Sequence, residues 1–204
     1  MLKLKVCGMR DEHNLDQLLQ LKPDFVGFIF YKNSSRLITQ PLNIAKPKHV
    51  KYVGVFVNDT IENITNAIQK FQLDYIQLHG QESPEFCLKI TQLGVKVIKA
   101  FNINTQTNFN DIYKYSDTCQ FFLFDATGKL PGGNGISFNW EILKKYKGET
   151  PFFLSGGIQL SMAWKIKYLF HPKLYAIDIN SQFEYKPALK NINNISIFKD
   201  ELQR

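Results

Sequence analysis

The feature that most constrains the fold of this chain is a regular alternation of short apolar segments with longer stretches of helical spacing. Eight segments have the apolar, β-branched or aromatic character of strands. They comprise a first segment that ends at Cys7, followed by residues 25–30, 52–57, 74–78, 95–101, 121–124, 151–154 and 174–177. Such alternation implies parallel strands, and eight units favour a closed (β/α)8 (TIM) barrel over an open doubly wound sheet. We therefore expect an α/β protein with one barrel domain over residues 1–204.

Helical spacing and helix start signals place the connecting helices. Asp11 and Ser83 can each cap a helix, and Pro84 suits the first position of the second one. Further helices are expected at residues 42–46, 60–71, 109–115, 140–146 and 161–170, with a last helix between residues 187 and 202. The first strand lacks the GxGxxG pattern of a dinucleotide-binding sheet, which also favours the barrel.

Composition and cysteine usage indicate a soluble intracellular protein. Hydrophobic residues make up 44% of the chain and charged residues 21%, which is ordinary for a globular protein. No apolar run is long enough for a membrane helix, and the N-terminus leads directly into a strand pattern, so we expect neither a membrane span nor a signal peptide. Cys7, Cys87 and Cys119 lack CxxC spacing and a nearby His pair. They argue against a disulfide scaffold or a metal site and fit a reducing cytoplasm.

The formal net charge of +7 raises the question of an anionic partner. The lysines are scattered, and no basic run is interleaved with aromatic residues, so we do not expect nucleic-acid binding. A generally basic surface explains the charge, and attraction of a small polyanionic substrate is a narrower explanation.

The first strand divides its side chains in an unusual way. Leu4 and Val6 share one face, whereas Lys3, Lys5 and Cys7 share the other, because side chains alternate along a strand. For this strand taken by itself, an edge strand with solvated lysines and a small buried cysteine is the simpler interpretation. The alternative is a functional thiol at the strand end. Lys5 could then lower the pKa of Cys7 and populate the thiolate, and Lys5→Met would raise that pKa.

In a barrel of this kind, functional residues lie at the carboxyl ends of the strands. Polar residues and glycines gather at the predicted ends while the strand interiors stay mostly apolar. The residues at the predicted carboxyl ends of the strands are, in chain order, Cys7, the loop that leads to Arg36, Asn58, His79, Phe101, Asp125, Ser155, Gly156, Gly157, Asp178, Ile179, Asn180 and Ser181.

The last two strand ends occupy the usual phosphate position of such barrels. Gly156 and Gly157 let the backbone approach an anion, and Asn180 and Ser181 follow the eighth strand. Two tight turns would explain the same residues. We predict phosphate binding here and include Asp178 among the substrate-binding residues.

Asp125 closes an apolar strand and shares the face of Leu123 and Phe121. Partial burial would raise its pKa and suit a general acid, although a helix cap or a loop carboxylate is the plainer role. The first and sixth strands roughly face each other across a closed barrel. A substrate could therefore lie between Cys7 as general base and Asp125 as general acid.

Two more polar side chains complete the predicted site. Arg36 could hold a substrate carboxylate through two parallel hydrogen bonds, and a solvated surface arginine is equally compatible with its loop. His79 could be a second acid–base group or a packed residue hydrogen-bonded at the rim. We favour the rim role and count His79 among the substrate-binding residues.

Taken together, these segments resemble the phosphoribosylanthranilate isomerase family of tryptophan biosynthesis. The matching segments, in chain order, are Lys5-Val6-Cys7-Gly8-Met9, Gly27-Phe28-Ile29-Phe30, Ser34-Ser35-Arg36, Val53-Gly54-Val55-Phe56-Val57-Asn58, Gln77-Leu78-His79-Gly80-Gln81-Glu82, Asp125, Gly132-Gly133-Asn134-Gly135, Phe138-Asn139-Trp140 and Leu154-Ser155-Gly156-Gly157. The resemblance covers nearly the whole chain in the right order.

The resemblance implies an Amadori rearrangement of N-(5-phosphoribosyl)anthranilate to 1-(2-carboxyphenylamino)-1-deoxyribulose 5-phosphate. Asp125 would protonate the ring oxygen, Cys7 would remove the proton at C2, and Arg36 would hold the anthranilate carboxylate. The family needs no metal and no organic cofactor. The expected partner is this phosphorylated small molecule, and a monomer and a homodimer are both compatible with the sequence.

One region departs from the family pattern. Gln182 and Ala188 stand where the family usually has glycine, and Asn191 stands where it usually has an acid. Two other functions stay open on the residues alone: another phosphate-binding barrel isomerase or epimerase of a pentose phosphate, and a barrel that binds a phosphorylated ligand without catalysis. The presence of both Cys7 and Asp125 speaks against the second.

Overall fold

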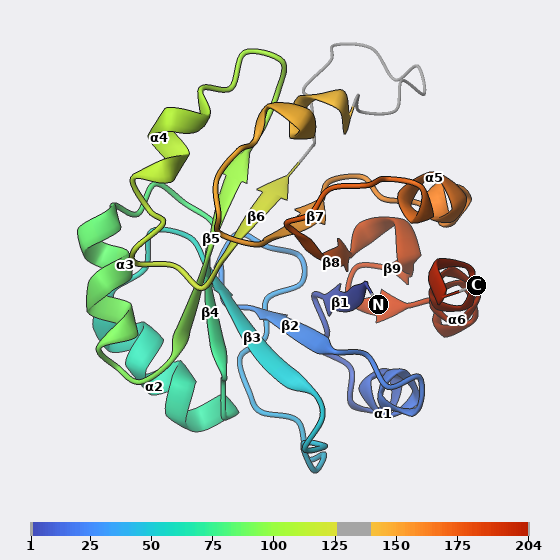
Figure 1. Ribbon diagram of the computed structural model, residues 1–204. Helices are drawn as coiled ribbons and strands as arrows, with labels where there is room; N and C mark the ends of the chain where they lie inside the picture. Colours follow the sequence, from blue (N-terminus) through green and yellow to red (C-terminus); the bar gives the residue numbers. More distant parts are fainter. Residues whose placement is uncertain (1, 126–139, 204) are drawn as a thin grey trace.

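The computed structural model describes residues 2–125 and 140–203, and its eight parallel strands close into a barrel in chain order (Figure 1). The barrel strands are β1 (Lys3–Cys7), β2 (Phe25–Ile29), β3 (Lys51–Phe56), β4 (Tyr75–Leu78), β5 (Lys96–Asn102), β6 (Phe121–Asp125), β7 (Phe152–Ser155) and β8 (Leu174–Ile179). Pairing of β1 with both β2 and β8 closes the cylinder. The predicted (β/α)8 barrel is confirmed.

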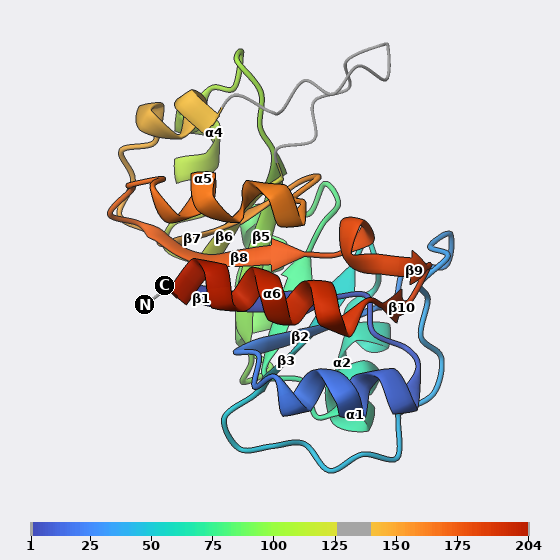
Figure 2. The ribbon, with the colours of Figure 1, turned by 90° about the vertical axis from the view of Figure 1, so that its right-hand side faces the viewer.

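Helices surround the barrel. They are α1 (Glu12–Gln20), α2 (Ile61–Phe71), α3 (Pro84–Thr91), α4 (Phe109–Tyr113), α5 (Ala163–Lys167) and α6 (Ile192–Gln203), with the 3-10 segments η1 (Trp140–Lys145), η2 (Leu160–Met162) and η3 (Ser181–Phe183). Figure 2 shows α6 lying between α1 and α5 on the outside of the barrel. None of the helices in the described ranges is long and apolar enough to cross a membrane.

The predicted helix starts are correct where a side chain caps the helix. The Asp11 carboxylate accepts a hydrogen bond from the backbone N–H of Asn14 at 2.8 Å. The Ser83 hydroxyl accepts one from the N–H of Phe86, and Pro84 follows it as the first helical residue. Both caps satisfy backbone donors that a helix start leaves unpaired.

Three expectations about helices are wrong. Residues 42–46 form no helix, because Pro41 and Pro47 confine the segment to less than two turns and short helices are marginal. Residues 140–146 form the tighter η1, and the helix expected over 161–170 is split into η2 and α5, which ends at Lys167. A small antiparallel pair also appears between β8 and α6, formed by β9 (Glu184–Lys186) and β10 (Leu189–Lys190).

The interpretation of the first strand as an edge strand with solvated lysines is also wrong. β1 is paired on both sides, and the Lys5 side chain points into the barrel, where it is completely buried. Only Lys3, near the start of the strand, reaches solvent and pairs with Asp24 at 2.8 Å. Closure of the barrel therefore makes one face of β1 interior rather than solvent-facing.

The apolar core has two parts. The larger part lies between the strands and the helices and includes Leu4, Val6, Phe122 and Phe124. A smaller cluster fills the barrel interior and consists of Phe25, Val53, Tyr75, Ile98, Ala100, Phe121, Leu123, Phe153 and Ala176. Because this cluster plugs the cylinder, the open space available to a ligand lies toward the carboxyl ends of the strands.

Candidate active site

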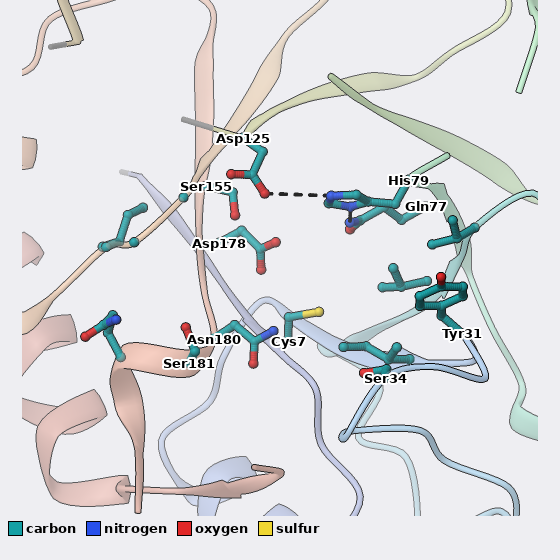
Figure 3. Close-up of a pocket in the computed structure, with 17 residues that line it drawn as sticks. Cys7, Tyr31, Ser34, Gln77, His79, Asp125, Ser155, Asp178, Asn180 and Ser181 are labelled. Atoms are coloured by element: carbon teal, nitrogen blue, oxygen red, sulfur yellow. Dashed lines mark hydrogen bonds and ion pairs between the residues drawn. The ribbon is translucent and has the colours of Figure 1, made fainter. Parts of the chain in front are cut away.

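A pocket of about 280 Å³ lies at the carboxyl ends of the barrel strands. Among the residues that line it are eight of the nine predicted site residues: Cys7, His79, Asp125, Gly156, Gly157, Asp178, Asn180 and Ser181. Figure 3 shows Asp125 and His79 on one side of the pocket and Cys7 on another, with Asp178 between them. The fold thus brings these side chains together, and the individual roles assigned to them remain predictions.

The two-residue repeat of the strands explains why these side chains meet. On β6, Phe121 and Leu123 belong to the interior cluster, and Asp125 is the next residue on the same face. On β4, Tyr75 is followed on its face by Gln77 and then His79. Each inward face is therefore apolar at the base of the barrel and polar at the mouth.

The Cys7 thiol is buried at the end of β1. Burial raises the pKa of Cys7 above its ordinary value, and the positive charges of Lys5 and Lys190 oppose this shift without overcoming it. The expectation that Lys5 makes the thiolate the populated form is therefore wrong, because the net shift of the Cys7 pKa is upward. Lys5 does act in the expected sense, but desolvation of the sulfur is the larger effect.

Lys5 is held by two acceptors inside the barrel. Its Nζ donates to Oδ2 of Asp178 at 2.9 Å and to Oε1 of Gln77 at 2.8 Å. The pair of Lys5 and Asp178 is buried, and such a pair is retained only when both charges keep good partners. The network links β8, β1 and β4 just below the pocket.

Asp178 has one oxygen left over. Within the described part of the chain, its Oδ1 is buried and has no hydrogen-bond partner. Burial raises the pKa of Asp178, and the nearby charge of Lys5 lowers it less. Buried acceptors are almost always satisfied, so this oxygen at the pocket wall is a candidate contact for a hydrogen-bond donor.

His79 lies between Gln77 and Asp125. The Gln77 Nε2 is 2.8 Å from Nδ1 of His79, and Nε2 of His79 is 3.7 Å from Oδ2 of Asp125. Burial lowers the pKa of His79, while the negative charge of Asp125 opposes the shift. The predicted rim position is what the structure shows, and the histidine faces the pocket from it.

Arg36 does not line the pocket. Its Nε and Nη2 donate to the carboxylate of Glu184 at 2.7 to 3.0 Å, and its side chain lies over Gly8 beside Cys7. Glu184 also accepts from Lys190 at 2.6 Å. Burial raises the pKa of Glu184, but hydrogen bonds and charges from these two cations outweigh it, so the pKa lies below its usual range. The guanidinium fork that was expected to hold a ligand carboxylate is thus occupied by a protein carboxylate.

Left-handed backbone conformations occur in the segments after β7 and β8. Gly156 and Gly157 have φ angles of +101° and +60°, which other residues rarely adopt. After β8, Ala188 has a φ of +68° at a place where the family usually has glycine. Asn191 takes over a capping role, because its Oδ1 accepts from the N–H of Asn194 at the start of α6.

Sequence reasoning missed Gln77 as a residue of the pocket wall. The signal was present: a polar side chain in an otherwise apolar strand, two residues before His79 and therefore on the same face. Its partner Lys5 precedes Cys7 on the same face of β1, and the strand pattern alone does not show that Lys5 contacts Gln77. The predicted glycine-bearing loop after Asp125, with residues 132–135 and 138–139 of the family pattern, lies outside the described residues.

Fold and pocket define a class of protein: an enzyme on a parallel (β/α)8 barrel, with acid–base side chains and glycine-containing loops around the carboxyl ends of the strands. Comparison with known proteins narrows this class. The family model described as N-(5'phosphoribosyl)anthranilate (PRA) isomerase matches residues 4–201. The chain belongs to this family.

Relatives and solved structures agree with the family. A Parabacteroides distasonis protein named N-(5'-phosphoribosyl)anthranilate isomerase is 42% identical over 98% of this chain and 92% of its own length. A Phocaeicola vulgatus protein of the same name is 40% identical, with 98% of each chain covered. The crystal structure of phosphoribosyl anthranilate isomerase from Thermotoga maritima has a TM-score of 0.85 at 29% identity and covers 100% of this chain and 99% of that chain.

A further structure of phosphoribosyl anthranilate isomerase, in complex with reduced 1-(o-carboxyphenylamino)-1-deoxyribulose 5-phosphate, has a TM-score of 0.82 at 28% identity. It covers 100% of this chain and 99% of that chain. This match extends the family likeness to a barrel that holds a phosphorylated sugar derivative.

Proposed function

We propose that this isomerase of tryptophan biosynthesis converts N-(5-phosphoribosyl)anthranilate to 1-(2-carboxyphenylamino)-1-deoxyribulose 5-phosphate with Cys7 as general base and Asp125 as general acid. The observation that carries the assignment is that the thiol and the carboxyl line one pocket at the mouth of the barrel. They come from β1 and β6, so a sugar bound in the pocket has one group on each side.

The reaction begins with Asp125. Its protonated carboxyl gives a proton to the ring oxygen of the ribose, the bond from that oxygen to C1 breaks, and the anilino nitrogen forms a C=N bond to C1. The ring opens to a protonated Schiff base. Asp125 is then a carboxylate, and the new hydroxyl at C4 keeps the proton.

Cys7 completes the rearrangement. Its thiolate removes the proton from C2, and the electron pair of that C–H bond moves to the C=N unit, which gives an enolamine. Loss of the C2 hydroxyl proton and protonation of C1 convert the enolamine to the ketone. Lys5 and Lys190 place positive charge near the sulfur, which favours the thiolate that this step needs.

The remaining predicted residues bind the substrate. The turns at Gly156 and Gly157, with Asn180 and Ser181 from the next strand end, are proposed to hold the phosphate. Asp178 Oδ1 is proposed to accept a hydroxyl of the sugar, which would satisfy its missing hydrogen bond.

Arg36 is proposed to orient the anthranilate carboxylate from the mouth of the barrel. Because Glu184 occupies Nε and Nη2, this contact uses Nη1 or displaces Glu184. A cation in this position beside Cys7 also suits a substrate with two anionic groups.

We place the enzyme in the cytoplasm as a monomer or a homodimer. The three cysteines are free in the structure, as thiols are in a reducing compartment. One similar structure is described as mutually generated monomers of the dimeric enzyme from Thermotoga maritima, so both states occur in this family.

The test uses the fluorescence change that accompanies consumption of the anthranilate-linked substrate. Wild type should turn the substrate over, and Cys7→Ser and Asp125→Asn should each lose roughly 10²-fold or more in kcat, as expected for removal of a general base or acid. Cys119→Ser and the exposed Asp111→Asn are matched controls that should keep wild-type rates. Equal rates in wild type, Cys7→Ser and Asp125→Asn would defeat the mechanism.

A further inference from the structure

The orientation of the buried Gln77 amide is fixed by Lys5. An ammonium group has only donors, so the atom that it contacts at 2.8 Å must be the amide oxygen of Gln77. The amide NH₂ therefore points the other way, to Nδ1 of His79 at 2.8 Å. Lys5 is itself held in place by Asp178, so the direction of the amide is set by a buried ion pair.

The amide in turn fixes the histidine. An NH₂ group can only donate, so Nδ1 of His79 must accept and carries no proton. The proton of the neutral ring is then on Nε2, the atom 3.7 Å from Oδ2 of Asp125. This contact is thus a neutral N–H facing a carboxyl group, and it is longer than a hydrogen bond until one of the two groups moves toward the other.

The charge of His79 matters for the proposed acid. A cation beside a carboxyl favours its ionised form, whereas a general acid must hold its proton until the substrate is bound. A neutral N–H can still orient the carboxyl and stabilise the carboxylate formed after proton transfer.

The other charged groups that face His79 are Lys5, Asp178 and Lys99. Lys5 and Asp178 neutralise each other, and Lys99 is held by Glu82 and by backbone carbonyls, including that of Leu78. Burial, which lowers the pKa of His79, acts in the same sense as the hydrogen bond from Gln77.

We propose that Gln77 is a positioning residue that keeps His79 neutral, with its proton on Nε2 and facing Asp125, so that Asp125 can act as the acid. The line of contacts runs from Asp178 through Lys5, Gln77 and His79 to Asp125, and Figure 3 shows its last three members side by side. This inference deepens the proposed function and rests on it for the role of Asp125.

Two substitutions separate the orientation of the ring from simple packing. Gln77→Glu keeps the shape but replaces the NH₂ donor by an acceptor, so His79 should carry a proton on Nδ1 and gain a positive charge more easily. Gln77→Met keeps a side chain of similar length without donor or acceptor, so neither ring tautomer is enforced.

The primary readout is the ¹⁵N NMR spectrum of the imidazole rings in the full-length protein. The chain has four histidines, and a His79→Asn variant assigns the signal of interest. Wild type at pH 7 should show Nδ1 unprotonated and Nε2 protonated, and Gln77→Glu should show Nδ1 protonated. A wild-type ring with a proton on Nδ1, as the other tautomer or as imidazolium, overturns the inference even if Gln77 variants fail to fold.

Steady-state kinetics give the second readout. Gln77→Glu should lower kcat by roughly tenfold or more, with KM changed less, and should move the pH profile of kcat, because the charge beside the proposed acid changes. A Gln77→Glu enzyme with the wild-type kcat and pH profile contradicts the inference. The NMR result needs no turnover, so an inactive wild type that shows the expected tautomer overturns the proposed function instead.

Discussion

At the scale of single residues, the proposed chemistry depends on how the Cys7 thiol is held. The sulfur is almost fully buried, which raises its pKa, and the cations around it restore only part of the thiolate. A thiol of this kind is a stronger base when ionised but is ionised less often at neutral pH. Burial of Cys7 therefore lowers the fraction of thiolate at neutral pH and makes the thiolate that does form a stronger base.

This balance predicts the pH dependence of Cys7 ionisation. Because burial raises the pKa of Cys7, the thiolate should form only above the ordinary range of a thiol, whose pKa is about 8.5. The rate of Cys7 alkylation against pH, followed by mass spectrometry, should show a midpoint above that value. Lys5→Met should move it higher still. A midpoint at or below about 8.5 in wild type would contradict the burial argument.

Gly27 on β2 supplies the space for the sulfur. It is paired with Cys7, and a Cβ on Gly27 would lie 2.7 Å from Sγ and 3.0 Å from Cα of Cys7. Gly27→Ala should therefore displace the thiol and reduce kcat strongly, at an overpacking cost of about 1 to 3 kcal/mol in unfolding free energy.

Gly54→Ala is the matched control for this change. Its Cβ would meet the side-chain ends of Leu73 at 2.6 Å and Phe56 at 2.8 Å, away from the pocket, so it should lower stability and leave kcat near wild type. Chemical denaturation measures the stability of both variants, and steady-state kinetics measure their kcat. Parallel loss of kcat in the two variants would mean that Gly27 has no special relation to the sulfur.

At the scale of elements, the segment between β8 and α6 shows how this chain accommodates its departures from the family pattern. Glu184 of β9 binds Arg36 and Lys190 and also accepts from the N–H of Ala188 at 3.2 Å. These contacts hold the short turn between β9 and β10 even though its left-handed residue is an alanine. Asn191 caps α6 with an amide oxygen in place of a carboxylate.

The strain at Ala188 is testable. An L-residue in the left-handed region costs about 1 to 2 kcal/mol, and the greater freedom of glycine in the unfolded chain offsets about 0.4 to 1 kcal/mol of the relief. Loss of the buried Ala188 methyl group costs a further ~0.8 kcal/mol, so Ala188→Gly should leave the stability of the protein nearly unchanged. Ala163→Gly, at an equally buried site with an ordinary φ of −53° in α5, should destabilise the protein. Equal loss of stability in the two variants, measured by chemical denaturation, would show that the turn carries no strain.

The presence of most strands and helices was predictable here because it depends on patterns of neighbouring residues. Apolar runs located all eight strands, and the side-chain oxygens of Asp11 and Ser83 located two helix starts. The helix over residues 42–46 was mispredicted because weak helical spacing outweighed the flanking prolines. The β9–β10 pair was missed because its two short strands have no apolar repeat.

At the scale of the whole molecule, barrel closure decides what each inward-facing residue does. The sequence predicted which residues lie at the strand ends, and the closed barrel brings eight of the nine to one pocket. It could not predict the contacts that orient them, because these join distant parts of the chain. Lys5 is 72 residues from Gln77 and 173 from Asp178, and Arg36 is 148 from Glu184.

The same closure explains why the strand-one lysine was misjudged. A strand seen alone gives no sign that its polar face will be interior, and a lysine is rarely buried without a partner. Only when β8 is placed beside β1 does Asp178 come within 2.9 Å of Lys5. The contacts among Lys5, Gln77 and Asp178, which lie between the interior apolar cluster and the pocket, therefore depend on the whole barrel.

The central claim, that one sugar lies between Cys7 and Asp125, is tested most directly by the crystal structure of this chain with reduced 1-(o-carboxyphenylamino)-1-deoxyribulose 5-phosphate bound. The account predicts the Cys7 sulfur in contact with C2, at about 3 to 4 Å. It predicts the Asp125 carboxyl within hydrogen-bond reach, about 2.6 to 3.2 Å, of the hydroxyl at C4. A ligand whose sugar touches only one of these groups, or binds at the other end of the barrel, would contradict it.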